Sequence, residues 1–394
     1  MKIALLGPSH PFRGGIIHFN SRLAAELQDR RDLTVDLFYW SKPYPEFLQP
    51  GPSRVCLDED SSLTFHRQGL QILSYTNPLT WVRLIKHLRR GRYDMFITHW
   101  VHPVHFPVFK VLFAALKLLT RIKIYLIVHN SLPHERFLGD KAMTRGVLNM
   151  AHRLVMHGQA EVNLARHIGV NHQKMIRTFH PVYDQFKPPS ESYEGIRRRL
   201  GLRKKVLLFF GFIRPYKGLD ILLSAFQTVA REYPDISLLI VGESFYAHVG
   251  EMGTKDLFLQ SLSKDDPLRS QIVWIDRYVS NEEVGGYFAV ADVFVAPYLS
   301  VTQSGPLNIA YAFNKPIIAS DLPAFRECVG VGESGYLFET GNPDDLAKKI
   351  EWFFKTPVSG EKVRRFRQRF SWERYADLLL EVVRPESSQS YEKQ

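Results

Sequence analysis

The chain contains 394 residues, of which 45% are hydrophobic and 23% are charged, and its formal net charge is +11 at pH 7. This length exceeds what one typical hydrophobic core fills, so we expect two domains. The two cysteines, Cys56 and Cys328, are too few and too widely spaced for a metal cluster or a disulfide framework, and they favour a reducing, cytoplasmic location. The positive charge calls for an acidic partner, which could be small-molecule phosphates, an anionic membrane surface or nucleic acid.

Short apolar runs alternate with helical patterns in the first half of the chain. The runs predict strands at residues 2–6, 34–39, 95–98, 123–128 and 153–156. Continuous apolar runs of this length are typical of parallel strands that are covered on both faces. The first run follows Met1 almost at once and is too short for a signal peptide. This half therefore predicts a doubly wound α/β domain.

One helical pattern in this half mixes apolar and basic residues. The apolar stretch at residues 106–125 is interrupted by Lys110, Lys117, Arg121 and Lys123. No run of 18 uncharged apolar residues occurs, so we do not expect a membrane-spanning helix. The pattern predicts an amphipathic helix packed on a sheet, and with the basic run at residues 86–92 it leaves contact with a membrane surface open.

A polar stretch at residues 187–205, rich in proline, serine and charge, predicts the domain boundary. Beyond it, further apolar runs predict strands at residues 206–210, 237–241, 272–274, 293–296 and 316–319. We expect one Rossmann-like domain at 1–186, a second at 187–365, and a closing helix and tail at 366–394 that return to the first domain. The two domains would face each other across a cleft, with ligands beyond the carboxyl ends of the strands.

Two turns of the first domain carry residues that could bind or react. Gly14 and Gly15 precede a helix, where they could expose N–H groups to an anion, admit a close ligand or simply make a tight turn. His129 follows a predicted strand and could donate, accept or transfer a proton, although a structural role is the alternative. His99, His102 and His105 lack the carboxylate or cysteine neighbours of a metal site, which favours loop packing or contacts with an acceptor.

The second domain repeats this arrangement with cations. Arg214 and Lys217 follow Gly211 between a buried strand and a helix, and they suit a diphosphate better than an idle surface pair. Later, Thr302, Gln303, Ser304 and Gly305 precede another helix. They could cap that helix or bind phosphate oxygens.

Several motifs together resemble the retaining glycosyltransferases of family 4, which have the GT-B fold. They are "FRGG", "HNSLPHE", "HPVYD", "GFIRPYKGLDILLSAF", "LLIVGE", "ADVFVAPY" and "NKPIIASDLPAFRE". Most of these motifs are loose when taken alone, but their order and spacing extend over essentially the whole chain. The resemblance implies the GT-B fold and a nucleotide diphosphate sugar as donor.

The resemblance also implies roles for individual residues. Arg214 and Lys217 would neutralise the donor diphosphate, and His129 would face the transferred sugar. The glycine pair would admit donor or acceptor, and a loop with Arg277 and Tyr278 would hold the base, partly through backbone groups. Further donor contacts would come from Gly211 and from residues 302–305. No metal or cofactor is implied, because cations and helix N-termini stabilise the leaving diphosphate.

One departure from the family concerns two glutamates that are usually eight residues apart before the Lys-Pro turn. Counting back from Lys315 places Val301 and Ile309 there, and the alternative register gives Gln303 and Tyr311. The "TQSG" loop therefore resembles a variant branch, in which Gln303 and Ser304 could take over polar contacts.

The expected function is a retaining, metal-independent glycosyltransferase of polysaccharide biosynthesis. It would transfer a sugar to a saccharide or lipid-linked saccharide, in the cytoplasm or as a peripheral protein at the inner face of the membrane. The alternatives are a nucleotide-sugar epimerase and a catalytically silent nucleotide-sugar binder. No nucleic-acid-binding module is recognisable, so we do not expect nucleic acid as a partner.

Overall fold

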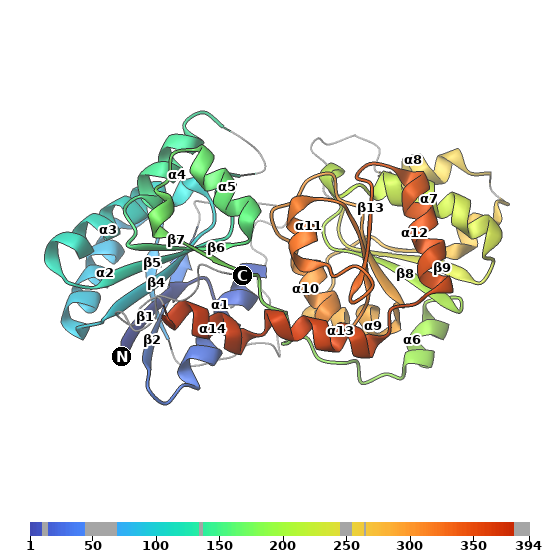
Figure 1. The fold of residues 1–394 in the computed structure, drawn as a ribbon. Helices are drawn as coiled ribbons and strands as arrows, with labels where there is room; N and C mark the ends of the chain where they lie inside the picture. The colour runs from blue at the N-terminus through green and yellow to red at the C-terminus, as the bar shows by residue number, and fades with distance from the viewer. Residues whose placement is uncertain (10–14, 44–68, 134–136, 245–253, 264, 382–394) are drawn as a thin grey trace. The chain divides into compact units, whose positions relative to one another are not determined.

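The computed structural model describes residues 1–9, 15–43, 69–133, 137–244, 254–263 and 265–381. These residues form two compact units (Figure 1). The first unit comprises the described residues up to Pro181 together with those from Phe370 onward, and the second runs from Val182 to Arg369. Each unit is built on its own parallel sheet.

The first unit has a sheet of seven strands in its described part, ordered β3-β2-β1-β4-β5-β6-β7. The strands are β1 (Lys2–Gly7), β2 (Thr34–Lys42), β3 (Leu70–Ser74), β4 (Met95–Trp100), β5 (Lys123–Val128), β6 (Arg153–His157) and β7 (Met175–Thr178). All neighbouring strands pair in parallel. Their side chains are mostly buried, as expected of a sheet covered on both faces.

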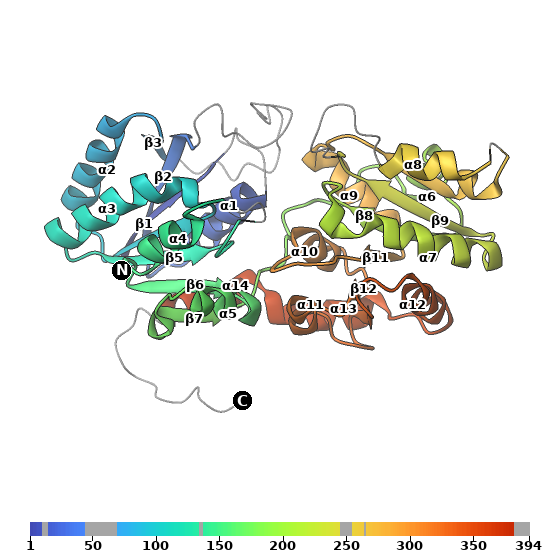
Figure 2. The same cartoon turned by 90° about the horizontal axis from the view of Figure 1, so that it is seen from above.

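Helices cover both faces of this sheet. They are α1 (Gly15–Gln28), α2 (Pro78–Gly91), α3 (Phe106–Leu119), α4 (Asp140–Leu148), α5 (Gln159–His167) and α14 (Trp372–Glu381), with short 3-10 turns at Pro103–His105 and His172–Lys174. Helices α2, α3 and α4 share one apolar core with the sheet (Figure 2). Helix α14 packs on α1, where Arg30 pairs with Asp377 at 2.5 Å.

The second unit has a sheet of six strands in its described part, ordered β10-β9-β8-β11-β12-β13. The strands are β8 (Lys205–Phe210), β9 (Ile236–Val241), β10 (Ile272–Ile275), β11 (Val293–Ala296), β12 (Ile317–Ser320) and β13 (Gly335–Phe338), all paired in parallel.

The described helices of this unit are α6 (Tyr193–Arg199), α7 (Leu219–Glu232), α8 (Thr254–Ser261), α9 (Asn281–Val290), α10 (Gly305–Ala312), α11 (Pro323–Cys328), α12 (Pro343–Lys355) and α13 (Gly360–Arg367). Five of them, α7 to α11, connect the strands in sequence, and the other three precede or follow the strands. Short 3-10 turns lie at Pro215–Lys217, Pro267–Gln271 and Gln368–Phe370. Helices α7 and α12 pack together against the sheet and form most of the core with it.

Every strand predicted from the sequence is present, and the doubly wound α/β architecture is confirmed. The sequence patterns did not predict β3, β7 and β13. These three lie at the outer edges of the two sheets, where strands are shorter and partly exposed. They therefore lack the continuous apolar run on which the other predictions depend.

The strand order indicates where a ligand would bind in each sheet. The order reverses between β1 and β4 in the first sheet and between β8 and β11 in the second. Ligands of such sheets bind at this switch point, beyond the carboxyl ends of the strands. Within the part of the chain that the structure describes, no helix is both long enough and apolar enough to cross a membrane.

Candidate functional site

The loop after β8 brings a lysine into the interior of the second unit. Lys217 is only 7% exposed, and its Nζ lies 5.6 Å from the centroid of the Tyr298 ring. A Cβ atom on Gly211, whose φ is +104°, would come within 2.8 Å of the same Nζ. No carboxylate of the described residues lies within 4.0 Å of this ammonium group. Lys217 is therefore a buried cation without a local counter-charge.

Burial disfavours the charged form of Lys217. Loss of hydration, and to a smaller extent the charge of Arg214, lower the pKa of Lys217 to about 7. An anion bound beside Nζ would reverse this effect, because an opposite charge stabilises the ammonium. A perturbed pKa at a strand end is typical of a functional site.

Helix α7 begins directly after this lysine. Its N-cap, Gly218, has φ +62°, and a Cβ there would lie 2.0 Å from the carbonyl oxygen of Pro297. Only glycine allows the loop after β8 to pack this closely against the loop after β11. No side chain caps the first turn of α7, so the N–H groups of this turn add partial positive charge just after Lys217 in the chain.

The segment before α10 lies against the same loop. A Cβ on Gly211 would come within 3.3 Å of Pro306, the residue after Gly305. Ser304 is buried, and its Oγ accepts a hydrogen bond from the N–H of Leu307 at 3.3 Å, so it caps α10. Thr302 and Gln303 precede it in half-buried positions. The structure thus brings Gly211, Lys217 and the start of α10 together.

The helix α10 does not supply a replacement for the missing glutamates. Ile309 is 6% exposed and Tyr311 is fully buried. The Tyr311 hydroxyl donates to the carbonyl oxygen of Cys328 at 2.5 Å and lies 2.9 Å from the Ser334 hydroxyl. Both side chains are therefore part of the core and are not available to a ligand.

Arg277 is engaged in an ion pair at the start of α9. Its guanidinium contacts both carboxylate oxygens of Glu283, at 2.9 and 2.5 Å. This pairing is the main cause that lowers the pKa of Glu283 to about 2. Because Glu283 also accepts from the N–H of Ser280, the loop at Tyr278 is fixed by its own contacts.

An aromatic residue that the sequence analysis missed lies next to this loop. Phe212 is 47% exposed, and its ring centroid is 6.4 Å from that of Tyr278. The two rings follow the carboxyl ends of β8 and β10. Exposed aromatic side chains at such a place suit the face of a nucleobase. The sequence could have indicated Phe212 as a binding residue, because it is an aromatic residue just beyond a buried strand, between Gly211 and a charged turn.

In the first unit, His129 is the last residue in a series of hydrogen bonds near the switch point between β1 and β4. Asn20 Nδ2 donates to the carbonyl oxygen of Pro8 at 3.0 Å, so its Oδ1 accepts from His99 Nε2 at 2.8 Å. His99 Nδ1 then accepts from His129 Nε2 at 3.0 Å. This order fixes the tautomer of His129, with its proton on Nε2 and a basic Nδ1.

Burial keeps these imidazoles neutral. Loss of hydration lowers the pKa of His99 to about 3 and holds the pKa of His129 well below its ordinary value. His129 is only 6% exposed and packs against the edge of the Phe19 ring at 4.9 Å. Gly15 is the first residue of α1 and is exposed, whereas Gly14 lies outside the described residues.

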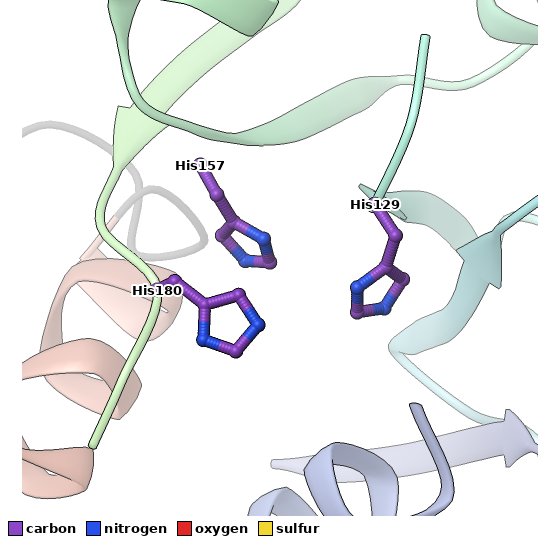
Figure 3. Close-up of side chains that lie close together, drawn as sticks. All are labelled: His129, His157 and His180. Atoms are coloured by element: carbon purple, nitrogen blue, oxygen red, sulfur yellow. The ribbon is translucent and has the colours of Figure 1, made fainter. Parts of the chain in front are cut away.

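Two further histidines approach His129 (Figure 3). His157 ends β6 and His180 follows β7, and each of the three residues has a ligand atom within 4.8 Å of the others. Three imidazoles are a donor set that zinc accepts, so this cluster could hold a metal ion. His157 Nε2 also hydrogen-bonds to the hydroxyl of Tyr375 on α14 at 3.0 Å, which ties the cluster to that helix.

The other two histidines of the "THWVHPVHF" stretch make hydrogen bonds to loop backbone. His105 Nε2 lies 3.0 Å from the carbonyl oxygen of Pro43, and His102 Nδ1 accepts from the N–H of Val104 at 3.2 Å. His99 does not join them, because β4 extends to Trp100 and His99 is part of the strand. His102 therefore packs within its loop as expected, His105 contacts the segment after β2, and His99 is part of a strand.

Comparison with known proteins shows that part of the chain is similar to one family. Residues 193–375 match the family model described as Glycosyl transferases group 1. Spore coat protein SA of Bacillus subtilis is 26% identical over 219 residues, which cover 52% of this chain and 55% of that protein. A D-inositol 3-phosphate glycosyltransferase of Streptomyces scabiei is 28% identical over 262 residues, covering 64% and 56% respectively. The chain spans about half the length of these curated relatives.

Solved structures match over nearly the full length. Anabaena HepE in complex with UDP has a TM-score of 0.71 at 16% identity, covering 97% of this chain and 99% of that one. The lipopolysaccharide outer core galactosyltransferase WaaB has a TM-score of 0.66 at 16% identity, covering 97% and 100%. At this identity the likeness shows the fold, so the expected pair of Rossmann-like domains of the GT-B class is confirmed. Residues 193–375 are therefore similar to the glycosyl transferases group 1 family.

Proposed function

We propose that the chain transfers a sugar from a nucleoside diphosphate sugar to a saccharide or lipid-linked saccharide acceptor, with retention of anomeric configuration. The second unit would bind the donor and the first unit the acceptor. Structures similar to this one bind UDP and UDP-glucose, which supports a donor of this class. The observation that carries the proposal is Lys217, a buried cation beside the uncapped start of α7.

The diphosphate would be the leaving group, and Lys217 and Arg214 would stabilise the negative charge that develops on it. The N–H groups at the start of α7 add to this stabilisation. No metal is needed in this scheme, because Arg214, protonated Lys217 and the start of α7 would supply the positive charge. The base would stack near Phe212 and Tyr278, with the backbone of the Arg277 loop as hydrogen-bonding partner.

Retention would follow a front-side course. The bond from the anomeric carbon to the phosphate oxygen breaks first, which leaves an oxocarbenium-like ion paired with the diphosphate. The acceptor hydroxyl then attacks from the same face, and its proton passes to the departing phosphate oxygen. His129 would accept a hydrogen bond from the transferred sugar through Nδ1, since its Nε2 proton is committed to His99.

A donor screen followed by a transfer assay tests this proposal. Nucleoside diphosphate sugars that raise the unfolding temperature are incubated with acceptor saccharides, and the products are separated and their anomeric configuration is read by NMR. Lys217→Met should weaken donor binding by about 1.5 to 3 kcal/mol, the range for a hydrogen bond to a charged group. Transfer with inversion, or unchanged donor binding by this variant, would contradict the proposal.

A second candidate is a catalytically silent nucleotide-sugar binder. The buried positions of Ile309 and Tyr311 favour it, because α10 then contributes no carboxylate to the sugar. Donor binding without transfer, hydrolysis or epimerisation of any tested sugar would support this candidate.

A further inference from the structure

Helices α2 and α3 lie side by side on one face of the first sheet, and their outer sides are strongly basic (Figures 1 and 2). The exposed cations are Arg83, Lys86, Arg89 and Arg90 on α2, and Lys110 and Lys117 on α3. Neither helix contains an acidic residue. Among the described residues, none of these six cations has a carboxylate within 4.0 Å. We call this surface the α2–α3 face.

The same face exposes large apolar side chains. Leu118 is 84% exposed and Leu79 is 77% exposed. Val82, Val111 and Leu119 are exposed as well. Scattered exposed leucines are ordinary, but a group of them on two adjacent helices marks an interaction surface.

Helical spacing puts the two kinds of side chain on one side. Leu79, Arg83, Lys86 and Arg90 follow one another at intervals of four, three and four residues, so they form a stripe along α2. The stripe lies opposite Leu84 and Leu88, which are buried in the core. On α3, Val111 and Leu118 are seven residues apart and therefore share a side. Each helix has 14 residues, so the face is about 21 Å long.

We propose that the α2–α3 face binds the surface of an anionic lipid bilayer. The cations would contact lipid phosphates, while Leu79 and Leu118 would enter the boundary between headgroups and acyl chains. A lipid surface accommodates both kinds of side chain, because basic and apolar contributions add at that boundary. A nucleic acid backbone would use the cations but would gain nothing from exposed aliphatic side chains.

This inference goes beyond the proposed transfer reaction and does not depend on it, because binding to vesicles requires no turnover. It names a surface that none of the donor residues occupies. A chain without transferase activity could still bind vesicles, and an active one could fail to bind. The two proposals can therefore fail separately.

The test is co-sedimentation of the full chain with phosphatidylcholine vesicles, with and without phosphatidylglycerol. We expect binding only when phosphatidylglycerol is present, and a decrease as salt is added. A variant with Arg83→Gln, Lys86→Gln, Arg89→Gln and Arg90→Gln should bind at least about 100-fold more weakly, since each cation near an anionic leaflet contributes about fivefold. All four side chains are exposed, so the variant should keep its fold, which thermal unfolding checks.

A matched control changes the same net charge elsewhere. The control variant neutralises four exposed cations of α12 and α13 in the second unit through Lys348→Gln, Lys362→Gln, Arg364→Gln and Arg365→Gln. This control should bind anionic vesicles within about twofold of the wild type, unless net charge alone drives binding.

The apolar contribution has its own pair of variants. Leu118→Ser should weaken vesicle binding by about tenfold, while Val331→Ser, at a residue 66% exposed in the second unit, should not.

Several results would overturn the proposal. One is a wild-type chain that does not bind anionic vesicles, and another is equal loss of binding in the α2 variant and its charge-matched control. A third is tight binding of duplex DNA that Leu118→Ser leaves unchanged, which would make the face a nucleic acid surface.

Discussion

Binding of a nucleoside diphosphate should place a proton on Lys217. Because burial and the charge of Arg214 lower the pKa of Lys217 to about 7, only about one tenth of the unliganded molecules carry this proton at pH 8. A diphosphate beside Nζ would raise the pKa again, since a nearby opposite charge favours the ammonium form. If the pKa in the complex exceeds about 9, binding takes up roughly 0.8 proton per site at pH 8.

Calorimetry measures this uptake directly. UDP is titrated into the protein at pH 8 in buffers of different ionisation enthalpy, and the slope of the observed enthalpy against the buffer enthalpy gives the number of protons. Lys217→Met should abolish the slope and weaken binding by about 10- to 150-fold. Phe212→Ala should weaken binding but keep the slope, because it removes no titrating group. A wild type without slope, or an equal slope in Lys217→Met, would refute this reasoning.

Three other predictions test the rest of the site. Phe212→Ala should lose about tenfold in affinity for UDP but not for inorganic pyrophosphate, because only the base would stack on this ring, and equal losses would contradict this. Since burial lowers the pKa values of His99 and His105 to about 3 and 4, the unfolded state alone takes up their protons below about pH 6.5. The free energy of unfolding in urea should therefore fall by about 2 kcal/mol per histidine between pH 7 and pH 5, and His105→Gln should show the smaller fall. Transfer should persist after treatment with EDTA, and a loss of transfer that added zinc restores would contradict this expectation.

The sequence could predict the cations of the second unit but not their environment. A charged turn between a buried strand and a helix is a local pattern, so Arg214 and Lys217 were recognisable. The environment of Lys217 includes the Tyr298 ring, which is far from it in the chain. No local pattern records such a contact or the burial that lowers the pKa of Lys217.

The proximity of the three clustered histidines could also not be predicted from the sequence. His129 was recognisable because it follows a strongly apolar strand. His157 and His180 also stand at strand ends, but their proximity requires β5, β6 and β7 to be consecutive neighbours in the sheet. Because β7 is a partly exposed edge strand, it was not predicted, and without it His180 had no place at the same edge.

The segment at residues 301–311 contains no glutamate, and this affects the charge balance of the candidate donor site. Ile309 and Tyr311 occupy the two positions at which the second glutamate would be expected, and both are packed into the core. These positions therefore supply no negative charge to offset the cations of the second unit. Gln303 offers a neutral amide instead, which can bind hydroxyl groups but adds no negative charge. Burial and the charge of Arg214 therefore keep the pKa of Lys217 low in the unliganded protein, and a bound ligand would have to supply the negative charge that raises it. In a site of this kind, donor binding and protonation of the lysine are coupled, and the affinity for diphosphates should fall as the pH rises above the pKa of the free lysine.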